Sequence, residues 1–334
     1  MHKPIVVFLG ILICLALAHP VLAGTYVTFD IPGACSAGYP AGINKWGSVT
    51  GSYTNCSSSR PLGFLYRSSG VITTFSVPGA WNTVPTSISA KGWIVGYYSG
   101  GDGVWHGFLR NPKYTTIDVP GAGSNSGQGT QVLSINDAGE MSGVYFDESS
   151  VEHGFIRDAS GAYTSFDVLG GIAVTAAWLN QSGQIAGSYT TLGNVYHGYV
   201  REEDGTIASF DAPDSTDTHV IGINSAEDTT GYFFPKSGGT QQFSRDQYGN
   251  VTTFRIPGFL LTAGISDNGN TVGTYKNGAK YRGWKRTAAG TVTYFSDPLA
   301  TGSGTFPTCV SGDGKVAGIY NDSSGNQHSF VLRN

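Results

Sequence analysis

Short apolar segments alternate with polar, glycine-rich turns along the chain from residue 25 onward, without the 3.6-residue period of an amphipathic helix. A typical unit begins with an apolar piece that ends in a turn such as "INDAG" at 135–139, and a second piece ends in Gly-x-aromatic. A third piece is centred on an aromatic residue, and a fourth reads like "TTIDVPGA" at 115–122. This pattern predicts a four-stranded antiparallel meander.

The unit occurs seven times, with apolar anchors separated by 42 to 47 residues. The anchors are Ile43, Ile88, Ile135, Leu179, Ile223, Ile265 and Val310. The aromatic centres of the third piece are Phe64, Phe108, Phe155, Tyr199, Phe243, Trp284 and Phe330. Four-stranded units with a period of about 40 to 50 residues are typical of β-propeller blades.

The two ends of the chain carry complementary parts of one unit. The seventh unit stops after its third strand at "QHSFVLRN", and "TYVTFDIPGA" at 25–34 is a lone fourth strand. We therefore predict an all-β fold, a seven-bladed β-propeller that the N-terminal strand closes by completing the last blade. A linear β-solenoid is the alternative, but it would need atypical capping units at both ends.

The repeated phrases carry a family resemblance. "INDAGEMSGVY", "HGFLR" and "TTIDVPGA" resemble the extracellular HAF-repeat proteins, named for a His-aromatic segment such as the one at 106–110. The resemblance covers residues 25–334 and is loosest where "QQFSR" and "RGWKR" replace His-Gly-Phe-x-Arg. It implies a secreted propeller, and it implies no catalytic residue, since this family has no established activity.

A basic start and an apolar stretch from Ile5 to Ala18 precede the first repeat strand. This stretch is shorter than the roughly 20 residues that a bilayer requires, so we expect a cleaved signal peptide at 1–23 and a single propeller domain at 24–334. A retained signal-anchor is the alternative. The expected location is secreted, extracellular or periplasmic, with no stable membrane insertion.

Composition narrows the class of partner. Charged residues make up 13% of the chain, its formal net charge is −4, and there is no run of Lys or Arg. Nucleic acid is therefore not expected as a partner. We expect a monomer.

Three cysteines, Cys35, Cys56 and Cys309, follow the expected signal peptide. A Cys35–Cys56 disulfide would join the closure strand to blade 1 and leave Cys309 free; a Cys35–Cys309 disulfide is the alternative.

Several repeated polar and aromatic residues are interpreted as structural. His106, His153, His197 and His328 occupy equivalent positions in different blades, too far apart to share a metal ion, so we expect hydrogen bonds to loop backbone. Each of Arg110, Arg157 and Arg201 is expected to form a cross-strand ion pair with Asp118, Asp167 and Asp211, respectively. We also expect packing from the second-strand aromatics, which are Tyr53, Tyr98, Tyr145, Tyr189, Phe233, Tyr275 and Tyr320.

Residues outside the repeat are the better functional candidates, because a repeated residue serves every blade. The loops between second and third strands and those between blades are expected on one face, where ligands bind. Loop-face candidates are Tyr39, Trp81, Asp102, Asp147, Glu148, Glu152, Asp214, Asp217, His219 and Phe306. Ligand contacts are predicted for Tyr39, Trp81, Phe306 and the unusual Trp178, and the catalytic candidates are Asp214, Asp217 and His219. We predict no metal site and no cofactor. A structural calcium ion is the alternative, but the turns "NDAGE" and "SDNGN" lack the alternating carboxylates of a calcium loop.

Aromatic platforms with acidic rims suit glycans, so the first hypothesis is a secreted propeller that presents a ligand-binding loop face to a glycan or another extracellular ligand. The second is a carbohydrate-active enzyme, a polysaccharide lyase or glycoside hydrolase, with its site at the channel mouth. The third is a structural surface protein.

Overall fold

The computed structural model describes residues 24–175 and 177–333. The signal peptide expected at residues 1–23 lies outside the described residues. In the described part of the chain, no helix is long and apolar enough to cross a membrane.

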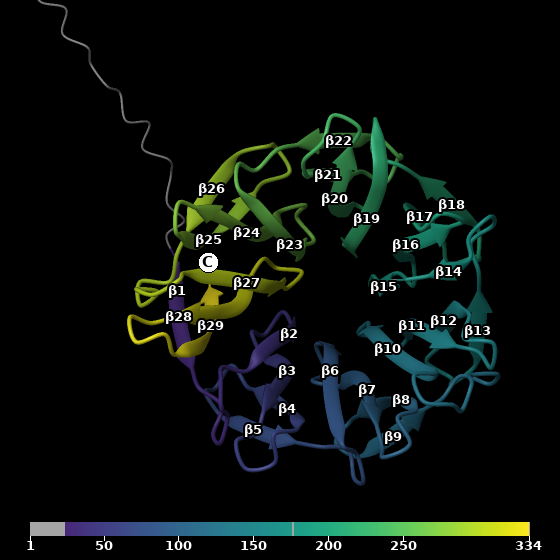
Figure 1. Ribbon diagram of the computed structural model, residues 1–334, viewed down its shortest axis with the longest axis horizontal. Coiled ribbons are helices and arrows are strands. Elements are labelled where there is room, and N and C mark those ends of the chain that lie inside the picture. Colours follow the sequence, from purple (N-terminus) through teal and green to yellow (C-terminus); the bar gives the residue numbers. More distant parts are fainter. Residues whose placement is uncertain (1–23, 176, 334) are drawn as a thin grey trace, which may run out of the picture.

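Seven groups of antiparallel strands, called blades below, stand side by side around a common centre (Figure 1), as the sequence predicts. A parallel pairing of Gly129 with Trp105 joins blades 2 and 3 into one eight-stranded sheet. Blade 1 contains β2 (Tyr39–Ile43), β3 (Val49–Thr54), β4 (Pro61–Tyr66) and β5 (Ile72–Phe75). Blade 2 contains β6 (Asn82–Ile88), β7 (Ile94–Ser99), β8 (Trp105–Arg110) and β9 (Tyr114–Ile117). Blade 3 contains β10 (Gly129–Ile135), β11 (Met141–Phe146), β12 (Glu152–Arg157) and β13 (Tyr163–Phe166).

The inner strand of blade 4 is split into β14 (Ala173–Val174) and β15 (Trp178–Leu179), followed by β16 (Ile185–Thr191), β17 (Val195–Arg201) and β18 (Ile207–Phe210). Blade 5 contains β19 (Ser215–Ile223), β20 (Thr229–Pro235), β21 (Gln241–Arg245) and β22 (Val251–Phe254). Blade 6 contains β23 (Phe259–Ile265), β24 (Thr271–Asn277), β25 (Lys280–Arg286) and β26 (Val292–Phe295). Blade 7 contains β27 (Thr305–Val310), β28 (Val316–Asn321), β29 (Gln327–Arg333) and the N-terminal β1 (Thr25–Phe29).

The closure of the ring by β1 is confirmed. β1 pairs antiparallel with β29, from Thr25 opposite Arg333 to Phe29 opposite Ser329. In Figure 1 the purple β1 lies beside the yellow strands of blade 7. Phe29 and Ile31 are buried, and the Phe29 ring stacks on Tyr66 of blade 1 with ring centroids 4.1 Å apart. The closure strand therefore joins the last blade to the first one.

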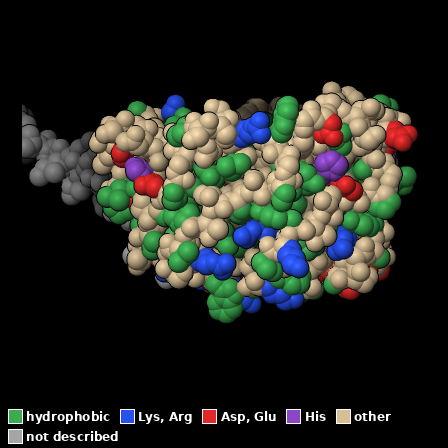
Figure 2. Space-filling view, turned by 90° about the horizontal axis from the view of Figure 1, so that it is seen from below, with side chains coloured by type: hydrophobic (Ala, Val, Ile, Leu, Met, Phe, Trp, Pro, Cys, Tyr) green, Lys and Arg blue, Asp and Glu red, His purple; other side chains and the backbone are tan. Residues whose placement is uncertain are grey.

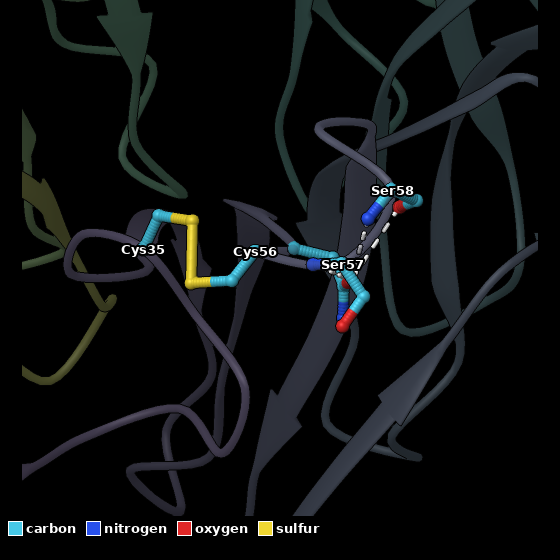
Figure 3. Close-up of a disulfide and its surroundings, with 5 residues drawn as sticks. Cys35, Cys56, Ser57 and Ser58 are labelled. Atoms are coloured by element: carbon cyan, nitrogen blue, oxygen red, sulfur yellow. Dashed lines mark hydrogen bonds between the residues drawn. A yellow bond between two sulfur atoms is a disulfide. The ribbon is translucent and has the colours of Figure 1, made fainter.

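A disulfide reinforces this junction. Cys35 follows the closure strand, and it is bonded to Cys56 in the β3–β4 loop of blade 1 (Figure 3). Backbone hydrogen bonds from Cys35 N–H to Thr54 O (3.0 Å) and from Cys56 N–H to Gly33 O (3.1 Å) hold the same two segments together. Cys309 is a free, buried cysteine. The predicted pairing is thus confirmed.

The third-strand aromatics form the centre of each blade, because this strand has neighbouring strands on both sides. All seven predicted residues are 0% exposed: Phe64, Phe108, Phe155, Tyr199, Phe243, Trp284 and Phe330. The glycine that precedes them in most blades makes room for the fourth-strand aromatic, since a Cβ atom at Gly154 would collide with the Phe166 ring. The repeated Gly-aromatic pair is therefore a packing requirement.

The "IN-x-x-G" turns connect successive blades. Asn136 accepts hydrogen bonds from the N–H groups of Gly139 and Glu140 through Oδ1, and its Nδ2 donates to Asn180 O of the next blade (3.3 Å). Asn180 repeats the contact with Asn224 O (3.1 Å), and Asn224 with Ser266 O (3.0 Å). Gly139 has a φ of 100°, which a tight turn of this kind requires. The asparagine is thus a structural residue of the repeat.

Candidate functional site

The two faces of the ring carry different side chains. The face with the β2–β3-type turns also carries the turns between third and fourth strands, and the opposite face, called the loop face below, carries the longer loops between second and third strands and the connections between blades. In the side view of Figure 2, imidazoles lie against carboxylates near the upper edge of the wall, whereas most Lys and Arg side chains lie in its lower half. The strand register determines toward which face of the ring each of these side chains lies.

Four repeat histidines form one kind of contact, with the carboxylate at the end of the fourth strand. The Nδ1–O distances are 3.0 Å for His106–Asp118, 2.7 Å for His153–Asp167, 2.9 Å for His197–Asp211 and 2.8 Å for His328–Asp30. Each imidazole also faces the second-strand tyrosine of its blade; the Tyr145 and His153 ring centroids, for example, are 5.0 Å apart. The prediction of hydrogen bonding was right, but the predicted partner, loop backbone, was wrong.

The predicted Arg–Asp ion pairs were wrong for the same reason. Gly107 pairs with Ile117, which places His106 beside Asp118, while Arg110 pairs with Tyr114 at the other end of the strand. Arg110 instead stacks on Phe75 of the preceding blade, with 4.7 Å between the guanidinium carbon and the ring centroid. Arg201 on Phe166 and Arg245 on Phe210 repeat this contact between blades, at 5.3 Å and 5.0 Å. Arg110, Arg201 and Arg245 are thus inter-blade packing residues. Arg157 differs, because its guanidinium carbon lies 5.6 Å from the ring centroid of Tyr163 in its own blade.

Two of the predicted ligand contacts are prominent on the surface. The exposed fractions of Tyr39 and Trp81 are 53% and 55%. The Arg60 guanidinium lies 5.5 Å from the Trp81 ring centroid. Phe306 is half-buried, and its ring centroid lies 4.8 Å from that of Tyr281 in blade 6. These residues come from three consecutive blades of the closed ring, which are blades 7, 1 and 2.

Trp178, the fourth predicted ligand contact, lies on the inner strand of blade 4. It begins β15 and lines the central channel, a cavity of about 260 Å³ whose other walls come from the inner strands of the neighbouring blades. The equivalent positions in other blades include Gly42, Ser87 and Gly264, which line the same cavity. The large indole therefore narrows the channel from one side, and Trp178 belongs to the channel wall rather than to a loop.

The loop face brings together an aromatic cluster around His219, on the long inner strand of blade 5. The cluster consists of Tyr196 from blade 4, His219, Tyr232 and Phe234 from blade 5, and Phe259 from blade 6. The His219 ring centroid is 4.4 Å from that of Tyr196 and 4.7 Å from that of Tyr232, which is stacked at an interplanar angle of 16°. Phe234 is 39% exposed, so the cluster reaches the surface. We call this set the blade 5 cluster.

Electrostatics distinguish the three catalytic candidates. Asp217 and His219 lie on one side of β19, and burial lowers the pKa of His219, with the Asp217 charge opposing this effect. The imidazole is therefore mainly neutral at pH 7. Asp217 Oδ1 accepts a hydrogen bond from Tyr196 N–H (3.1 Å), which joins blades 4 and 5. Asp214 is exposed in a turn with a φ of 55°, where its carbonyl oxygen accepts a hydrogen bond from Lys236 N–H.

The other loop-face acids divide into turn residues and one unusual carboxyl group. Asp102 Oδ1 accepts a hydrogen bond from Val104 N–H, and Asp147 Oδ1 accepts from Ser149 and Val151 N–H. Glu152 is different, because burial raises the pKa of its side chain to about 7. This half-buried carboxyl begins β12, next to the split inner strand of blade 4. The Glu152 carboxyl group therefore changes its protonation state near neutral pH.

Sequence reasoning identified His219 and Asp217 but missed Tyr196, Tyr232, Phe234 and Phe259. A signal was present: "GYFF" at 231–234 has three consecutive aromatics where blade 4 has "GSYT" at 187–190. In the described part of the chain, no group of three His, Cys, Asp or Glu side chains could hold a metal ion. The site is therefore defined by aromatic rings with one carboxylate and one imidazole.

Comparison with known proteins defines the class. No protein-family model and no curated protein matches the sequence. The fold is similar to virginiamycin B lyase from Staphylococcus aureus, solved with quinupristin, with a TM-score of 0.60 and 14% identity over 93% of this chain and 100% of that chain. It is also similar to the propeller domain of the trilobed protease from Pyrococcus furiosus (TM-score 0.62, 12% identity, 92% and 95% coverage). A puromycin-hydrolyzing peptidase from Mycobacterium tuberculosis matches at TM-score 0.62 and 13% identity, over 94% of this chain and 54% of that chain.

The protein is thus a β-propeller. A lyase, a propeller domain of a protease and a peptidase share this architecture, and identities of 12% to 14% show the fold alone. A functional conclusion has to come from the loop face of this chain.

Proposed function

We propose that this protein is a secreted propeller of the HAF-repeat type that binds an extracellular glycan at the blade 5 cluster. The observation that carries the proposal is the convergence of five rings from three blades, with Phe234 exposed. Sugar rings present C–H faces that pack on aromatic rings, and a few polar groups then orient them. Asp217 and the neutral His219 provide such groups.

A location outside the cytoplasm is consistent with a glycan ligand. The Cys35–Cys56 disulfide is typical of proteins that fold in an oxidising environment, outside the cytoplasm. The low charge of the chain, 13% Asp, Glu, Lys and Arg, is consistent with a neutral or weakly charged partner. Glycans are abundant ligands of this kind outside cells.

Binding is tested with a panel of neutral oligosaccharides, read by thermal shift and by calorimetry. We expect Tyr232→Ala and Phe234→Ala to weaken binding about tenfold or more, since truncating a central aromatic contact costs 1 kcal/mol or more. Tyr248→Ala is the matched control, because Tyr248 is equally aromatic, highly exposed and located in a third-to-fourth strand turn. Equal losses in all three variants, or no binding by the wild type, would count against the proposal.

The Asp217–His219 pair favours a second candidate, a carbohydrate-active enzyme. A neutral imidazole can accept a proton at pH 7, which is the task of the general base in a polysaccharide lyase. Virginiamycin B lyase is a lyase of similar fold, but at 14% identity it transfers no residue to this chain. Mass spectrometry of the same glycan panel detects products. Turnover that survives in Asp214→Asn, Asp217→Asn and His219→Ala would exclude this site.

A further inference from the structure

Four blades share a second-strand tyrosine, a third-strand histidine and an aspartate after the fourth strand. Blade 6 keeps only the tyrosine of this arrangement. Tyr275 pairs with Arg282, and the pairing of Gly283 with Phe295 places Arg282 beside Ser296. The same register in blade 7 pairs Tyr320 with His328 and places His328 beside Asp30. Arginine thus replaces the imidazole, and a hydroxyl group replaces the carboxylate.

This replacement leaves positive charge without a carboxylate partner. The Tyr275 side chain is hydrogen-bonded to Arg282 and to Asn277. Among the described residues, Lys or Arg ion pairs with carboxylates occur at Lys45–Asp137 and Lys315–Asp313, and they include neither Arg282 nor the adjacent, exposed Lys276. In the four histidine blades, by contrast, an acidic side chain faces the basic group.

The neighbouring blade extends the same charge. In blade 5 the register places Arg255 at the position that Asp118, Asp167, Asp211 and Asp30 occupy in their blades, because Gln242 pairs with Phe254. Arg255 is exposed. On the rim, blade 5 therefore carries a guanidinium group where four other blades carry a carboxylate, and blade 6 carries one where those blades carry an imidazole.

A cavity opens at this position. It has a volume of about 720 Å³, and the residues that line it include Tyr275, Lys276, Asn277, Arg282, Tyr294 and Ser296. The Lys276 ammonium itself lies 5.8 Å from the Tyr281 ring centroid. The Tyr275 and Tyr294 ring centroids are 4.5 Å apart, so the two rings form one aromatic wall. The cavity thus combines a guanidinium group, two tyrosine rings, an amide and a hydroxyl group.

We propose that this blade 6 pocket binds the carboxylate or sulfate group of an acidic saccharide. The Arg282 guanidinium offers a planar set of N–H donors that matches an oxyanion in two parallel hydrogen bonds. Ser296 and Asn277 hydrogen-bond sugar hydroxyls, and the tyrosine rings pack against the sugar ring. The saccharide part of this inference rests on the proposed function, whereas the anion part rests on the pocket alone.

The test compares oligogalacturonate with its fully methyl-esterified form, which has the same sugars without the charge, by calorimetry on the intact protein. A sulfated disaccharide and inorganic sulfate are the additional probes. We expect the wild type to bind the acidic oligomer or the sulfated disaccharide at least about tenfold more tightly than the uncharged one, and to lose this preference as salt is raised. Inorganic sulfate should bind more weakly than either saccharide.

The informative variant is Arg282→His with Ser296→Asp, which restores the blade 7 arrangement and should remove the preference without lowering the melting temperature. Arg282→Lys should retain part of it, since the charge remains but the planar donor set is lost. His106→Ala, which disrupts a histidine blade, is the matched control and should retain the preference. An unchanged preference in Arg282→His with Ser296→Asp, or the absence of any preference in the wild type, overturns the inference.

The two proposals fail independently. Tyr232→Ala in the blade 5 cluster should weaken neutral glycans and leave the acidic preference intact. If neutral glycans do not bind but the acidic preference depends on Arg282, the proposed function fails and the blade 6 pocket stands. If inorganic sulfate binds as tightly as the acidic saccharides, the saccharide part of the inference is wrong.

Discussion

Blades 6 and 7 use the same scaffold in different ways. Trp284 and Phe330 fill equivalent core positions and are both fully buried. On the rim, however, His328 of blade 7 lies between Asp30 (2.8 Å) and Asp322 (3.5 Å), while Arg282 of blade 6 borders an open cavity. The comparison teaches that core positions serve blade packing in every repeat, whereas the rim position is free to change its chemistry.

Blade 7 also differs from blade 6 in its assembly, because its fourth strand comes from the other end of the chain. Removal of this strand should have the largest effect on stability. A chain that begins at Gly38 lacks β1, so blade 7 loses its fourth strand and the edge of β29 is exposed. Phe29 and Ile31 alone should contribute about 1.5 to 3 kcal/mol each through burial. We expect a markedly lower melting temperature or oligomers, measured by calorimetry and size-exclusion chromatography.

The truncation also removes Cys35, so full-length Cys56→Ser is its control. Melting of the truncated chain at the temperature of residues 24–334 would contradict the closure of blade 7 by β1.

The disulfide should have the next largest effect. Cys35 and Cys56 are separated by 21 residues, and a bond that closes a loop of this length stabilises by about 3 kcal/mol in the chain-entropy model. The double substitution Cys35→Ser with Cys56→Ser should therefore lower the melting temperature by several degrees while blade 6 retains its ligand. An unchanged melting temperature would show that the backbone hydrogen bonds between these segments are sufficient.

The smallest effect on stability is expected from the loss of the His328 ion pair in blade 7. Burial lowers the pKa of His328, but the hydrogen bonds and charges of Asp30 and Asp322 outweigh burial and raise the net pKa above 6.5. The group therefore stabilises the fold fully below about pH 6.5, and this contribution is lost as the pH rises through the folded-state pKa. Exposed pairs of this kind contribute about 1 kcal/mol or less.

Asp30→Asn tests this directly. The difference in melting temperature between wild type and variant should be larger at pH 5.5 than at pH 9. Asp214→Asn, in an exposed turn of blade 5, is the control and should show no such trend. A difference that is the same at both pH values would mean that the Asp30–His328 contact is not an ion pair in the folded protein.

The blade architecture could be predicted because its signals are local and repeated. Phe155 and its six equivalents recur at a constant position in each unit, and each must fill the same space between two strands. The closure strand was recognisable because Phe29 and Ile31 match the fourth-strand pattern of the other units. Cys35 and Cys56 were also recognisable because they do not belong to the repeat, and both lie near the junction of blades 7 and 1.

The partners of the rim residues were not predictable with the same certainty. Arg110 and His106 are both within reach of Asp118 in sequence, and only the register of β8 and β9 decides that the imidazole is the neighbour. Trp178 stood out in the sequence because most equivalent positions hold Gly or Ser, but only the structure places it in the wall of the central channel.

The sequence by itself determined the number of blades, the strand order and the buried aromatics, because periodic packing leaves the same pattern in every repeat. It favoured the Cys35–Cys56 disulfide, and the structure decides against the Cys35–Cys309 alternative. The tertiary structure alone decided which side chains meet between blades, such as Tyr196 with His219 and Phe259 with Tyr232. These contacts depend on how neighbouring sheets are placed around the ring. That placement is set by the packing of the whole closed ring rather than by any single repeat.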